Sequence, residues 1–391
     1  MSALTFPIQT EALVVHSPGA DFLMTPILVN ELRPDEVLVE IQYAGLCHTD
    51  LLLQHGLLPS LPFPAIAGHE GAGTIIALGS PDITSRSSQL KPGAPVLLSF
   101  TSCGTCKPCT SNLPTKCPDM PRSNLRAIRP KDNTTAATLL SPSSNTTESV
   151  PVPVSAHFFG QSSFSRLAVV HERSIIPCQH PEQMHLYAPM GCGYQTGAGT
   201  IINVLKPGPS DAVLIFGMGS VGMAALMACK AINVQNVIAV DIVNGKLTLS
   251  KELGAGFTIN PLELASVVDA VKDATGGKGA KFAIDTTGVG KVVESMLECL
   301  AAGGTAASIG APPPGDKITV DAAAFFHMNK SWVSVIEGDS NPPEFIPYLI
   351  DLHRRGRFPV ERISKVYPVA EIKRAIADME AGIVIKPVLK F

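Results

Sequence analysis

Aromatic residues, charged residues and a basic surplus are all scarce in this sequence. Aromatic side chains make up 5% of its 391 residues and charged side chains 16%, and 30 Lys and Arg face 33 Asp and Glu. A nucleic-acid binder needs a basic field, so we expect no nucleic-acid partner. The N-terminus lacks a basic segment followed by an apolar core, so we expect no signal peptide and a cytoplasmic protein.

An uninterrupted membrane span is not expected either. Eighteen uncharged residues lie between Asp211 and Lys230, close to the length of a transmembrane helix. Three glycines, Gly217, Gly219 and Gly222, interrupt this stretch. They divide it into a short strand and a helix of small residues, so we expect no membrane partner.

Cysteine is sparse, and four of the nine cysteines form one cluster. Cys103, Cys106, Cys109 and Cys117 follow the spacing C-x2-C-x2-C-x7-C. Four thiolates this close can surround one tetrahedral Zn2+ as a closed structural site. Disulfide or redox use fits a chain without a signal peptide poorly, and an iron–sulfur cluster would use the same type of ligand. We therefore expect a structural zinc, with these two alternatives open.

The chain divides into segments of different pattern. Residues 1 to about 100 form short strands between turns, an all-β pattern with little helix. Residues 124–153 are rich in Ser, Thr, Asn and Pro, which predicts a long surface loop. From about residue 193 to 337, strands and helices alternate, which predicts a doubly wound parallel sheet. The tail from Phe345 predicts a helix, a strand and a second helix. The expected strands of the parallel sheet are Val213–Phe216, Val237–Val240, Phe282–Ile284 and Thr305–Ile309.

A glycine-rich turn follows the first strand of this alternating region. Gly217, Gly219 and Gly222 form G-x-G-x-x-G between the strand VLIF and a helix rich in Ala and Met. In this context the glycines let the backbone approach a pyrophosphate at the helix N-terminus. Asp241 ends the next strand, where a carboxylate accepts hydrogen bonds from a ribose diol. Because Asp241 would repel a 2'-phosphate, we expect NAD(H) rather than NADP(H).

Three further segments carry potential metal ligands in glycine-rich settings. They are Gly45–Asp50 (GLCHTD), Gly68–Glu70 (GHE) and Gly191–Gly193 (GCG). A buried cysteine is usually a small hydrophobic residue, and a lone histidine is usually a hydrogen-bonded core residue. Ligands so far apart form no local signature, so their spacing alone does not establish a site.

Taken in order, these segments resemble the zinc-dependent medium-chain alcohol dehydrogenases over nearly the whole chain. Two motifs, IEGDS at 336–340 and HRRGRFP at 353–359, are closest to the aryl- or benzyl-alcohol dehydrogenase branch of fungal type. The resemblance rests on GLCHTD, AGHEGAG at 67–73, the four-cysteine cluster, HFFGQSSFSRLAVV at 157–170, GCGYQTGAG at 191–199, GMGSVG with Asp241, and the ending IKPVLKF.

The resemblance implies an α/β fold class with two structural units. A GroES-like, β-rich catalytic domain would comprise residues 1–192, with a structural zinc lobe at 100–120 and the loop at 124–153. Residues 338–391 would return to this domain and complete it. A doubly wound parallel-sheet Rossmann domain that binds NAD would comprise residues 193–337. Dimers and tetramers both occur in the family, so we expect a homo-oligomer.

The resemblance also assigns residues to a second, catalytic zinc. Cys47, His69 and Cys192 would bind this ion, with the fourth position left to water or substrate oxygen. Asp50 would accept a hydrogen bond from His69 and fix its tautomer. Glu70 would lie just outside the ligands.

The remaining implied roles concern the proton, the cofactor and the substrate. Thr49 would take the proton of the bound alcohol. Leu52 stands where many relatives have a histidine that passes this proton outward, so His48 or water would complete the relay. His48 and Lys386 would contact the pyrophosphate of the cofactor, and Lys246 would contact its adenosine ribose. The substrate channel would be lined by Phe100, Phe158 and Phe159.

The implied activity is reversible hydride transfer between NAD and a primary alcohol, aryl or allylic, in the manner of enzymes of secondary metabolism. The partner is then a small alcohol or aldehyde. One alternative is a glutathione-dependent formaldehyde dehydrogenase of the same fold, which would need cationic groups at the channel mouth. Another is a zinc-ribbon interaction protein built on the cysteine cluster, against which the dinucleotide motif and the acidic balance argue.

Overall fold

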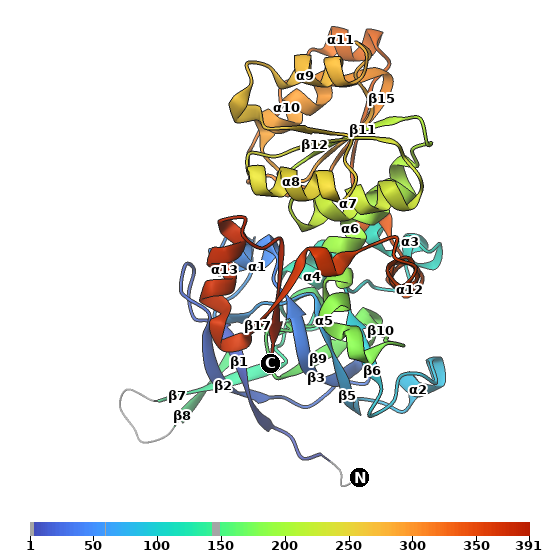
Figure 1. Cartoon of the computed structure of the whole chain (residues 1–391). Helices are drawn as coiled ribbons and strands as arrows, with labels where there is room; N and C mark the ends of the chain where they lie inside the picture. The colour runs from blue at the N-terminus through green and yellow to red at the C-terminus, as the bar shows by residue number, and fades with distance from the viewer. Residues whose placement is uncertain (1–3, 59, 143–148) are drawn as a thin grey trace.

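Three β-sheets organise the chain, which the computed structural model describes over residues 4–58, 60–142 and 149–391. Figure 1 shows two sheets in the lower half of the molecule and the third in the upper half. The lower half combines the first and last parts of the sequence, and the upper half comes from its middle.

The first sheet of the lower half is antiparallel throughout. Its strands contribute Ala12–Val15 and Ile27 to the core, and the four consecutive buried residues show that both faces of β1 are covered there. In spatial order it consists of β4 (Ala65–Ile66), β1 (Ile8–Val15), β2 (Leu23–Val29), β7 (Ala137–Pro142) and β8 (Ser149–Val154).

The second sheet joins the two ends of the sequence. Its central strand is β3 (Glu36–Gly45), whose consecutive residues Val37–Val39 are all fully buried. Because successive side chains point to opposite faces of a strand, both faces of β3 are covered there. The other strands are β5 (Gly71–Leu78) and β9 (Leu167–His171), which pair with β3, then β6 (Pro95–Leu98) and β10 (Ile175–Pro177) beyond β5, and β18 (Lys386–Lys390) with β17 (Ser364–Pro368) on the other side.

The third sheet is parallel and doubly wound, as predicted. Its order reverses between β11 and β14, the point at which such sheets bind ligands at the carboxyl ends of their strands. Helices cover both faces of the sheet (Figure 1). Its strands in spatial order are β13 (Phe257–Ile259), β12 (Asn236–Val240), β11 (Ala212–Phe216), β14 (Ala280–Asp285), β15 (Leu300–Ser308) and β16 (Ser331–Ser334).

The helices are short, and none in the described chain has the length and apolarity needed to cross a membrane. Those of the upper half are α7 (Ser220–Ala231), α8 (Asn244–Glu252), α9 (Val267–Ala274), α10 (Gly290–Glu298) and α11 (Ala322–His327). Those of the lower half are α1 (His48–Gln54), α2 (Asp82–Arg86), α3 (Lys107–Thr110), α4 (Met120–Leu125), α5 (Met184–Tyr187), α12 (Pro342–Arg354) and α13 (Ile372–Glu380).

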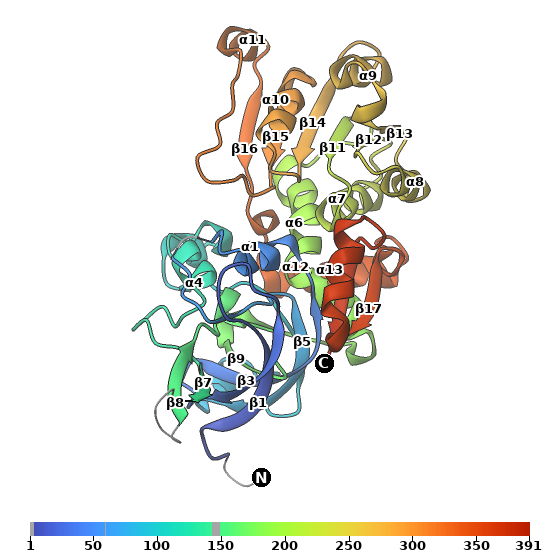
Figure 2. The ribbon, with the colours of Figure 1, turned by 90° about the vertical axis from the view of Figure 1, so that its left-hand side faces the viewer.

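One helix connects the two halves. Helix α6 (Gly193–Gly199) continues as a π-helical segment over residues 200–205 and lies between the halves in Figure 2. A side chain at Gly197 would lie 2.0 Å from the carbonyl oxygen of Val221, so α6 can approach α7 this closely only with glycine there. Tyr194 of α6 and Ile215 of β11 belong to one hydrophobic cluster. The position of one half relative to the other is therefore fixed by a packed contact.

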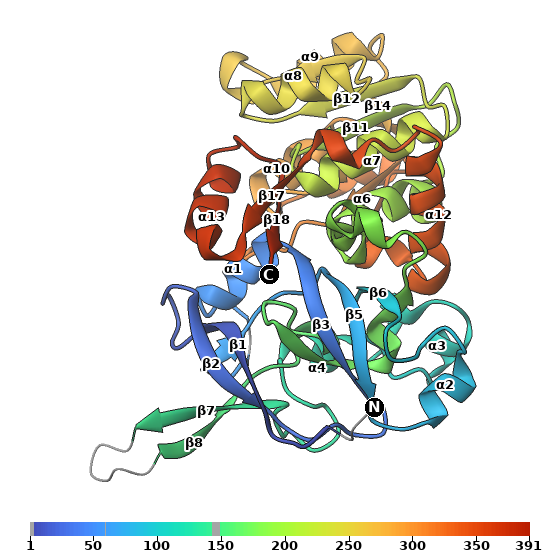
Figure 3. The same ribbon diagram turned by 60° about the horizontal axis from the view of Figure 1, so that its bottom comes forward.

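The prediction of a long surface loop at residues 124–153 is wrong. Asn124 lies in α4 and is buried, and its side chain bonds the N–H and the carbonyl oxygen of Thr101 at 2.9 and 3.0 Å. Strands β7 and β8 form a hairpin that projects from the lower half (Figures 1 and 3), and residues 143–148 lie outside the described residues. Pairing of β7 with β2 outweighs the turn-forming composition of this segment.

The buried side chain of His157, which follows β8, should make the stability of the fold depend on pH. Burial, with Arg129 nearby, lowers the pKa of His157 from 6.5 to about 4. The unfolded chain therefore binds a proton between these pH values that the folded chain excludes, and stability rises with pH across this window. From this group alone we expect the free energy of unfolding to be about 2 kcal/mol lower at pH 5 than at pH 7. Urea unfolding of the native chain and of His157→Gln at both pH values tests this, and an equal loss in the variant would contradict it.

Candidate active site

Three segments far apart in the sequence meet where α6 begins. Cys47 lies between β3 and α1, His69 lies between β4 and β5, and Cys192 directly precedes α6. Their donor atoms and a carboxylate oxygen of Glu70 all lie within 4.8 Å of one another. The fold thus brings together the three ligands that the resemblance implied for a catalytic zinc.

The buried ring of His69 shows that this cluster suits a metal ion. Its Nδ1 lies 3.0 Å from Oδ1 of Asp50, whereas its Nε2 is buried and has no hydrogen-bond partner among the described residues. A buried nitrogen without a partner is costly, and coordination would satisfy it. Hydrogen bonding between the two thiols lowers the pKa of Cys47 and raises the pKa of Cys192. Two sulfurs and one imidazole form a donor set that suits zinc with one open position.

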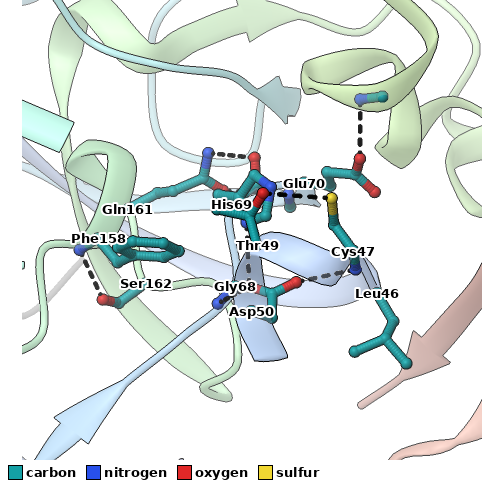
Figure 4. Close-up of polar contacts among 12 residues, drawn as sticks. Leu46, Cys47, Thr49, Asp50, Gly68, His69, Glu70, Phe158, Gln161 and Ser162 are labelled. Atoms are coloured by element: carbon teal, nitrogen blue, oxygen red, sulfur yellow. Dashed lines mark hydrogen bonds and ion pairs between the residues drawn. The ribbon is translucent and has the colours of Figure 1, made fainter. Parts of the chain in front are cut away.

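Asp50 holds two of these ligands in place. Its buried carboxylate accepts hydrogen bonds from the backbone N–H of Cys47 and of Gly68, both at 2.9 Å, as well as facing His69 Nδ1 (Figure 4). A proton on Nδ1 leaves Nε2 free to coordinate. The predicted role of Asp50 therefore has the geometry it needs.

Glu70 and Lys386 form a buried ion pair beside the ligands. Lys386 Nζ lies 2.9 and 3.0 Å from the two carboxylate oxygens of Glu70 and donates to the carbonyl oxygen of Leu46 at 3.1 Å. Burial alone would lower the pKa of Lys386, but the charge of Glu70 raises it above its usual value. Glu70 also accepts from the N–H of Gly193 at 2.9 Å, next to Cys192. Lys386 is thus engaged inside the protein, and its contact with a pyrophosphate stays a prediction.

The expected proton-relay residues lie on the first turn of α1. Thr49 is half-buried, and its Oγ1 lies 3.7 Å from Cys47 Sγ (Figure 4). His48 is exposed at the start of the helix, and Leu52 is half-buried one turn further on. A hydroxyl beside the ligands and an imidazole in solvent are therefore available, while the relay itself stays a prediction.

Phenylalanine rings surround the imidazole of His69. The ring centroid of Phe159 lies 4.7 Å from that of His69, and the centroid of Phe158 lies 5.5 Å away in an edge-on arrangement. Both rings are buried, as is Phe100. Phe159 has a φ of 52°, a strained value for an aromatic residue that surrounding contacts must hold. Phe158 and Phe159 form an apolar wall beside His69, and contact of the three rings with the substrate stays a prediction.

Gln161, for which the sequence predicted no role, holds the backbone of His69 in place. Its side-chain amide donates to the carbonyl oxygen of His69 at 2.9 Å (Figure 4). It also donates to the carbonyl oxygen of Ser99 at 3.1 Å, and its Oε1 accepts from Gly71 N–H at 3.1 Å. A buried glutamine has no sequence signature, because its partners are backbone groups of distant segments. The only sequence signal for Gln161 is its place within HFFGQSSFSRLAVV, one of the stretches on which the family resemblance rests.

Gln195 and Glu337 support Cys192 and were also missed. Gln195 Nε2 donates to the carbonyl oxygen of Gly191 at 2.6 Å and to Oε2 of Glu337 at 3.0 Å. Burial raises the pKa of Glu337 to about 7. Glu337 belongs to the IEGDS motif, which served as a branch marker and carried no predicted function.

The four-cysteine cluster is a separate candidate metal site. The sulfur atoms of Cys103, Cys106, Cys109 and Cys117 lie within 4.8 Å of one another. Hydrogen bonds from the backbone of Thr105 and Cys106 lower the pKa of Cys103 to about 6, and burial raises that of Cys117 to about 12. The cysteines are free of disulfide bonds. Four converging thiols, joined in this group by no His, Asp or Glu of the described residues, fit the closed tetrahedral site that the spacing predicts.

Removing one ligand of this site should act through stability. Cys106→Ser opens the tetrahedral set, whose bound metal contributes folding free energy. We expect the melting temperature to fall by about 5–10 °C and the zinc content to drop from two ions per chain to one. Calorimetry with metal analysis measures both, and an unchanged melting temperature would count against the site.

The predicted glycine loop connects β11 to α7. Gly217 has a φ of 86°, which favours glycine, and Gly219 directly precedes α7. A side chain at Gly222 would lie 1.9 Å from the carbonyl oxygen of Gly217. The loop therefore needs glycine for its turn and for its close packing, as a dinucleotide-binding loop does.

Asp241 stands beside this loop. Its carboxylate accepts hydrogen bonds from Met218 N–H at 2.6 Å and from Val243 N–H at 2.9 Å. Lys246 follows in the first turn of α8. Both residues lie at the carboxyl end of β12, where the ribose of a dinucleotide binds in such folds.

Comparison with known proteins agrees with this architecture. The alcohol dehydrogenase GroES-like domain matches residues 33–180, and the zinc-binding dehydrogenase family matches residues 220–353. The chain is 35% identical to a geraniol dehydrogenase of Castellaniella defragrans over 384 residues, which cover 98% of both proteins. It superimposes on benzyl alcohol dehydrogenase of Acinetobacter calcoaceticus with a TM-score of 0.88 at 33% identity, covering 98% of this chain and 99% of the other.

A third similar protein is an alcohol dehydrogenase zinc-binding domain protein of Burkholderia ambifaria, with a TM-score of 0.90 and 36% identity over 98% of this chain and 99% of the other. The chain therefore belongs to the zinc-dependent medium-chain alcohol dehydrogenase family. It is an oxidoreductase with a GroES-like catalytic domain and a Rossmann domain, which confirms the predicted fold class and zinc dependence.

Proposed function

We propose that this protein is an NAD-dependent alcohol dehydrogenase that reversibly oxidises primary aryl or allylic alcohols to aldehydes. The observation that carries the proposal is the meeting of Cys47, His69 and Cys192 beside an apolar wall of phenylalanines, at the start of the helix that joins the two halves. The names of the similar proteins, geraniol and benzyl alcohol dehydrogenase, support this substrate class.

The two metal sets have different expected roles. Cys103, Cys106, Cys109 and Cys117 would hold a structural zinc. Cys47, His69 and Cys192 would hold the catalytic zinc, which when bound supplies a Lewis acid that lowers the pKa of the substrate hydroxyl.

The chain's own residues orient the site and move the proton. Asp50 holds the His69 ring and Gln161 holds the backbone carbonyl of His69, while Glu70 holds the peptide after Cys192 through Gly193. Thr49 Oγ1 would accept the alcohol proton, and the exposed His48 ring would pass it to water in place of the histidine that Leu52 replaces. The buried rings exclude water from the carbon that changes oxidation state.

The choice of NAD over NADP should depend on Asp241. The ribose hydroxyls would donate to this carboxylate, which would repel a 2'-phosphate. Hydrogen bonds to a charged group contribute about 1.5–3 kcal/mol, so Asp241→Gly should raise the KM for NAD+ by about 10–100-fold and narrow the preference over NADP+. Steady-state kinetics with both cofactors tests this, and a native preference for NADP+ would contradict it.

We also retain the predicted domain division and assembly as proposals. Pairing of β18 with β3 supports residues 1–192 and 338–391 as one catalytic unit, and the six parallel strands support 193–337 as the cofactor unit. Strand β16 is an exposed sheet edge, with Trp332 40% exposed and nearby Phe326 79% exposed. Such an edge favours pairing between copies, so we propose a homo-oligomer. We propose separately that the protein is cytoplasmic. Light scattering that gave only monomers would refute the assembly.

The direct test is an activity screen of the two-zinc enzyme. NAD+ reduction should occur with benzylic and allylic primary alcohols and proceed far more slowly with aliphatic ones. Strict dependence on the glutathione adduct of formaldehyde would instead favour the formaldehyde dehydrogenase alternative.

A further inference from the structure

A short turn contacts residues beside both candidate metal sites. The 337–339 turn follows β16, and its residues Glu337, Gly338 and Asp339 have φ values of 49°, 65° and 46°. A side chain at Gly338 would lie 2.3 Å from the carbonyl oxygen of Gln195 and 2.8 Å from Cα of Gly199, so the turn sits directly on α6. Two non-glycine residues in this conformation persist only where surrounding contacts hold them.

One end of the turn supports the peptide that precedes Cys192. Glu337 is 6% exposed, and its Oε2 accepts from Gln195 Nε2 at 3.0 Å. Gln195 in turn donates to the carbonyl oxygen of Gly191 at 2.6 Å, and its Oε1 accepts from Ser340 at 2.9 Å. Glu337 in the turn and Ser340 directly after it therefore orient the side-chain amide of Gln195, which holds the peptide that precedes Cys192.

A further contact of Glu337 reaches the same helix. Its Oε2 also accepts from Thr196 Oγ1 at 3.3 Å. The carboxylate thus spans two consecutive residues in the first turn of α6, the turn that begins at Cys192.

The other end of the turn holds the four-cysteine lobe. Asp339 Oδ2 pairs with Lys116 Nζ at 2.8 Å, and its Oδ1 accepts from Thr115 Oγ1 at 3.4 Å. Thr115 is buried, and the two residues immediately precede Cys117. Three consecutive residues thus connect a ligand of the structural set to a ligand of the catalytic set.

We propose that the 337–339 turn couples the four-cysteine lobe to Cys192, so that loosening the lobe weakens metal binding at the catalytic site. This inference rests on the proposed assignment of the two zinc sites. Glu337 and Asp339 act through Gln195 and Lys116 and are positioning residues. The contacts form a continuous hydrogen-bonded and ion-paired network with strained backbone at its centre, and networks of this kind can carry coupling between distant sites.

The test measures the zinc affinities of the full chain by equilibrium competition with a chromophoric chelator. The binding step lost in Cys192→Ser identifies the catalytic site. Asp339→Asn combined with Thr115→Val removes the charge pair and the hydroxyl contact, and asparagine tolerates the left-handed backbone at 339. We expect the catalytic affinity to fall by about 10-fold, beyond any change at the lobe.

Glu344→Gln is the matched control, because Glu344 contacts Asn112 of the same lobe at 3.3 Å and, among the described residues, its side chain forms no hydrogen bond or ion pair with the turn. We expect it to leave the catalytic affinity within about twofold. Since coupling is reciprocal, Glu337→Gln should also lower the lobe affinity, which provides a second variant should the double variant fold poorly. The coupling would be overturned if the double variant lost zinc affinity only at the four-cysteine lobe. It would also be overturned if Glu344→Gln lowered the zinc affinity of the catalytic site. If Cys192→Ser lost no binding step, the site assignment itself would fall and the coupling with it.

Discussion

Cys192→Ser is expected to lower kcat by about 1,000-fold or more while leaving the fold intact. Loss of a hydrogen-bond partner of a metal ligand already costs about 10–100-fold, and loss of the ligand itself removes the catalytic ion. The four-cysteine site shares no ligand with this set, so it should keep its zinc. Metal analysis should then give one zinc per chain, and calorimetry should give a melting temperature close to the native one. Substantial activity in this variant would contradict the catalytic assignment.

Ser99→Ala offers a matched control for the same segment. Ser99 Oγ donates to the carbonyl oxygen of Gly191, next to Cys192, but Gln195 donates to that same oxygen. The peptide keeps one hydrogen bond in this variant, so the loss of kcat should be far smaller than in Cys192→Ser. Equal losses would show that distortion of the segment, rather than loss of the ligand, explains the effect.

Benzylic and allylic alcohols are expected to exceed ethanol in kcat/KM by about 100-fold or more. Burying a planar group releases about 25 cal/mol for each Å2 of apolar area removed from water, and contact with a phenylalanine ring adds about 0.5–1.5 kcal/mol for an aryl group. Ethanol gains little from either contribution. Each 1.4 kcal/mol corresponds to about tenfold in specificity, so the two contributions together account for the expected ratio.

The phenylalanine wall supplies the variant for this prediction. Phe158→Ala should raise the KM for benzyl alcohol much more than the KM for ethanol, because only the aryl ring loses its contact. Phe158 is fully buried beside His69, so zinc content serves as the control for an intact site. Similar kcat/KM values for ethanol and benzyl alcohol in the native enzyme would refute the substrate class even with both zinc sites in place.

The parallel sheet was predictable because its signals are local. The strand, the glycine loop and Asp241 lie close together in the sequence. The glycines permit the turn and its close packing, and Asp241 ends the next strand. The hairpin of β7 and β8 was not predictable, since its composition favours turns and its stability comes from pairing with β2, more than one hundred residues earlier. Local composition describes a segment in isolation and omits the strand it will meet.

The catalytic ligands were predictable only through resemblance to a family. Spacing alone could not join Cys47, His69 and Cys192, because folding brings three distant segments together. The same reason hid Gln161 and Glu337, whose partners are backbone or side-chain groups on other segments. For Lys386 the expected contact was a cofactor phosphate, and the structure shows a buried pair with Glu70 whose strength depends on the surrounding low dielectric.

Zinc-dependent oxidation at Cys47, His69 and Cys192 is tested most directly by NADH formation from benzyl alcohol and NAD+, with enzyme carrying two zinc ions per chain. The same preparation is then treated with a chelator until only the four-cysteine site stays filled. We expect rapid NADH formation by the two-zinc enzyme, almost none after chelation, and recovery when zinc is returned. Undiminished NADH formation by the one-zinc enzyme, or none by the two-zinc enzyme with any primary alcohol, would contradict a catalytic zinc at this site.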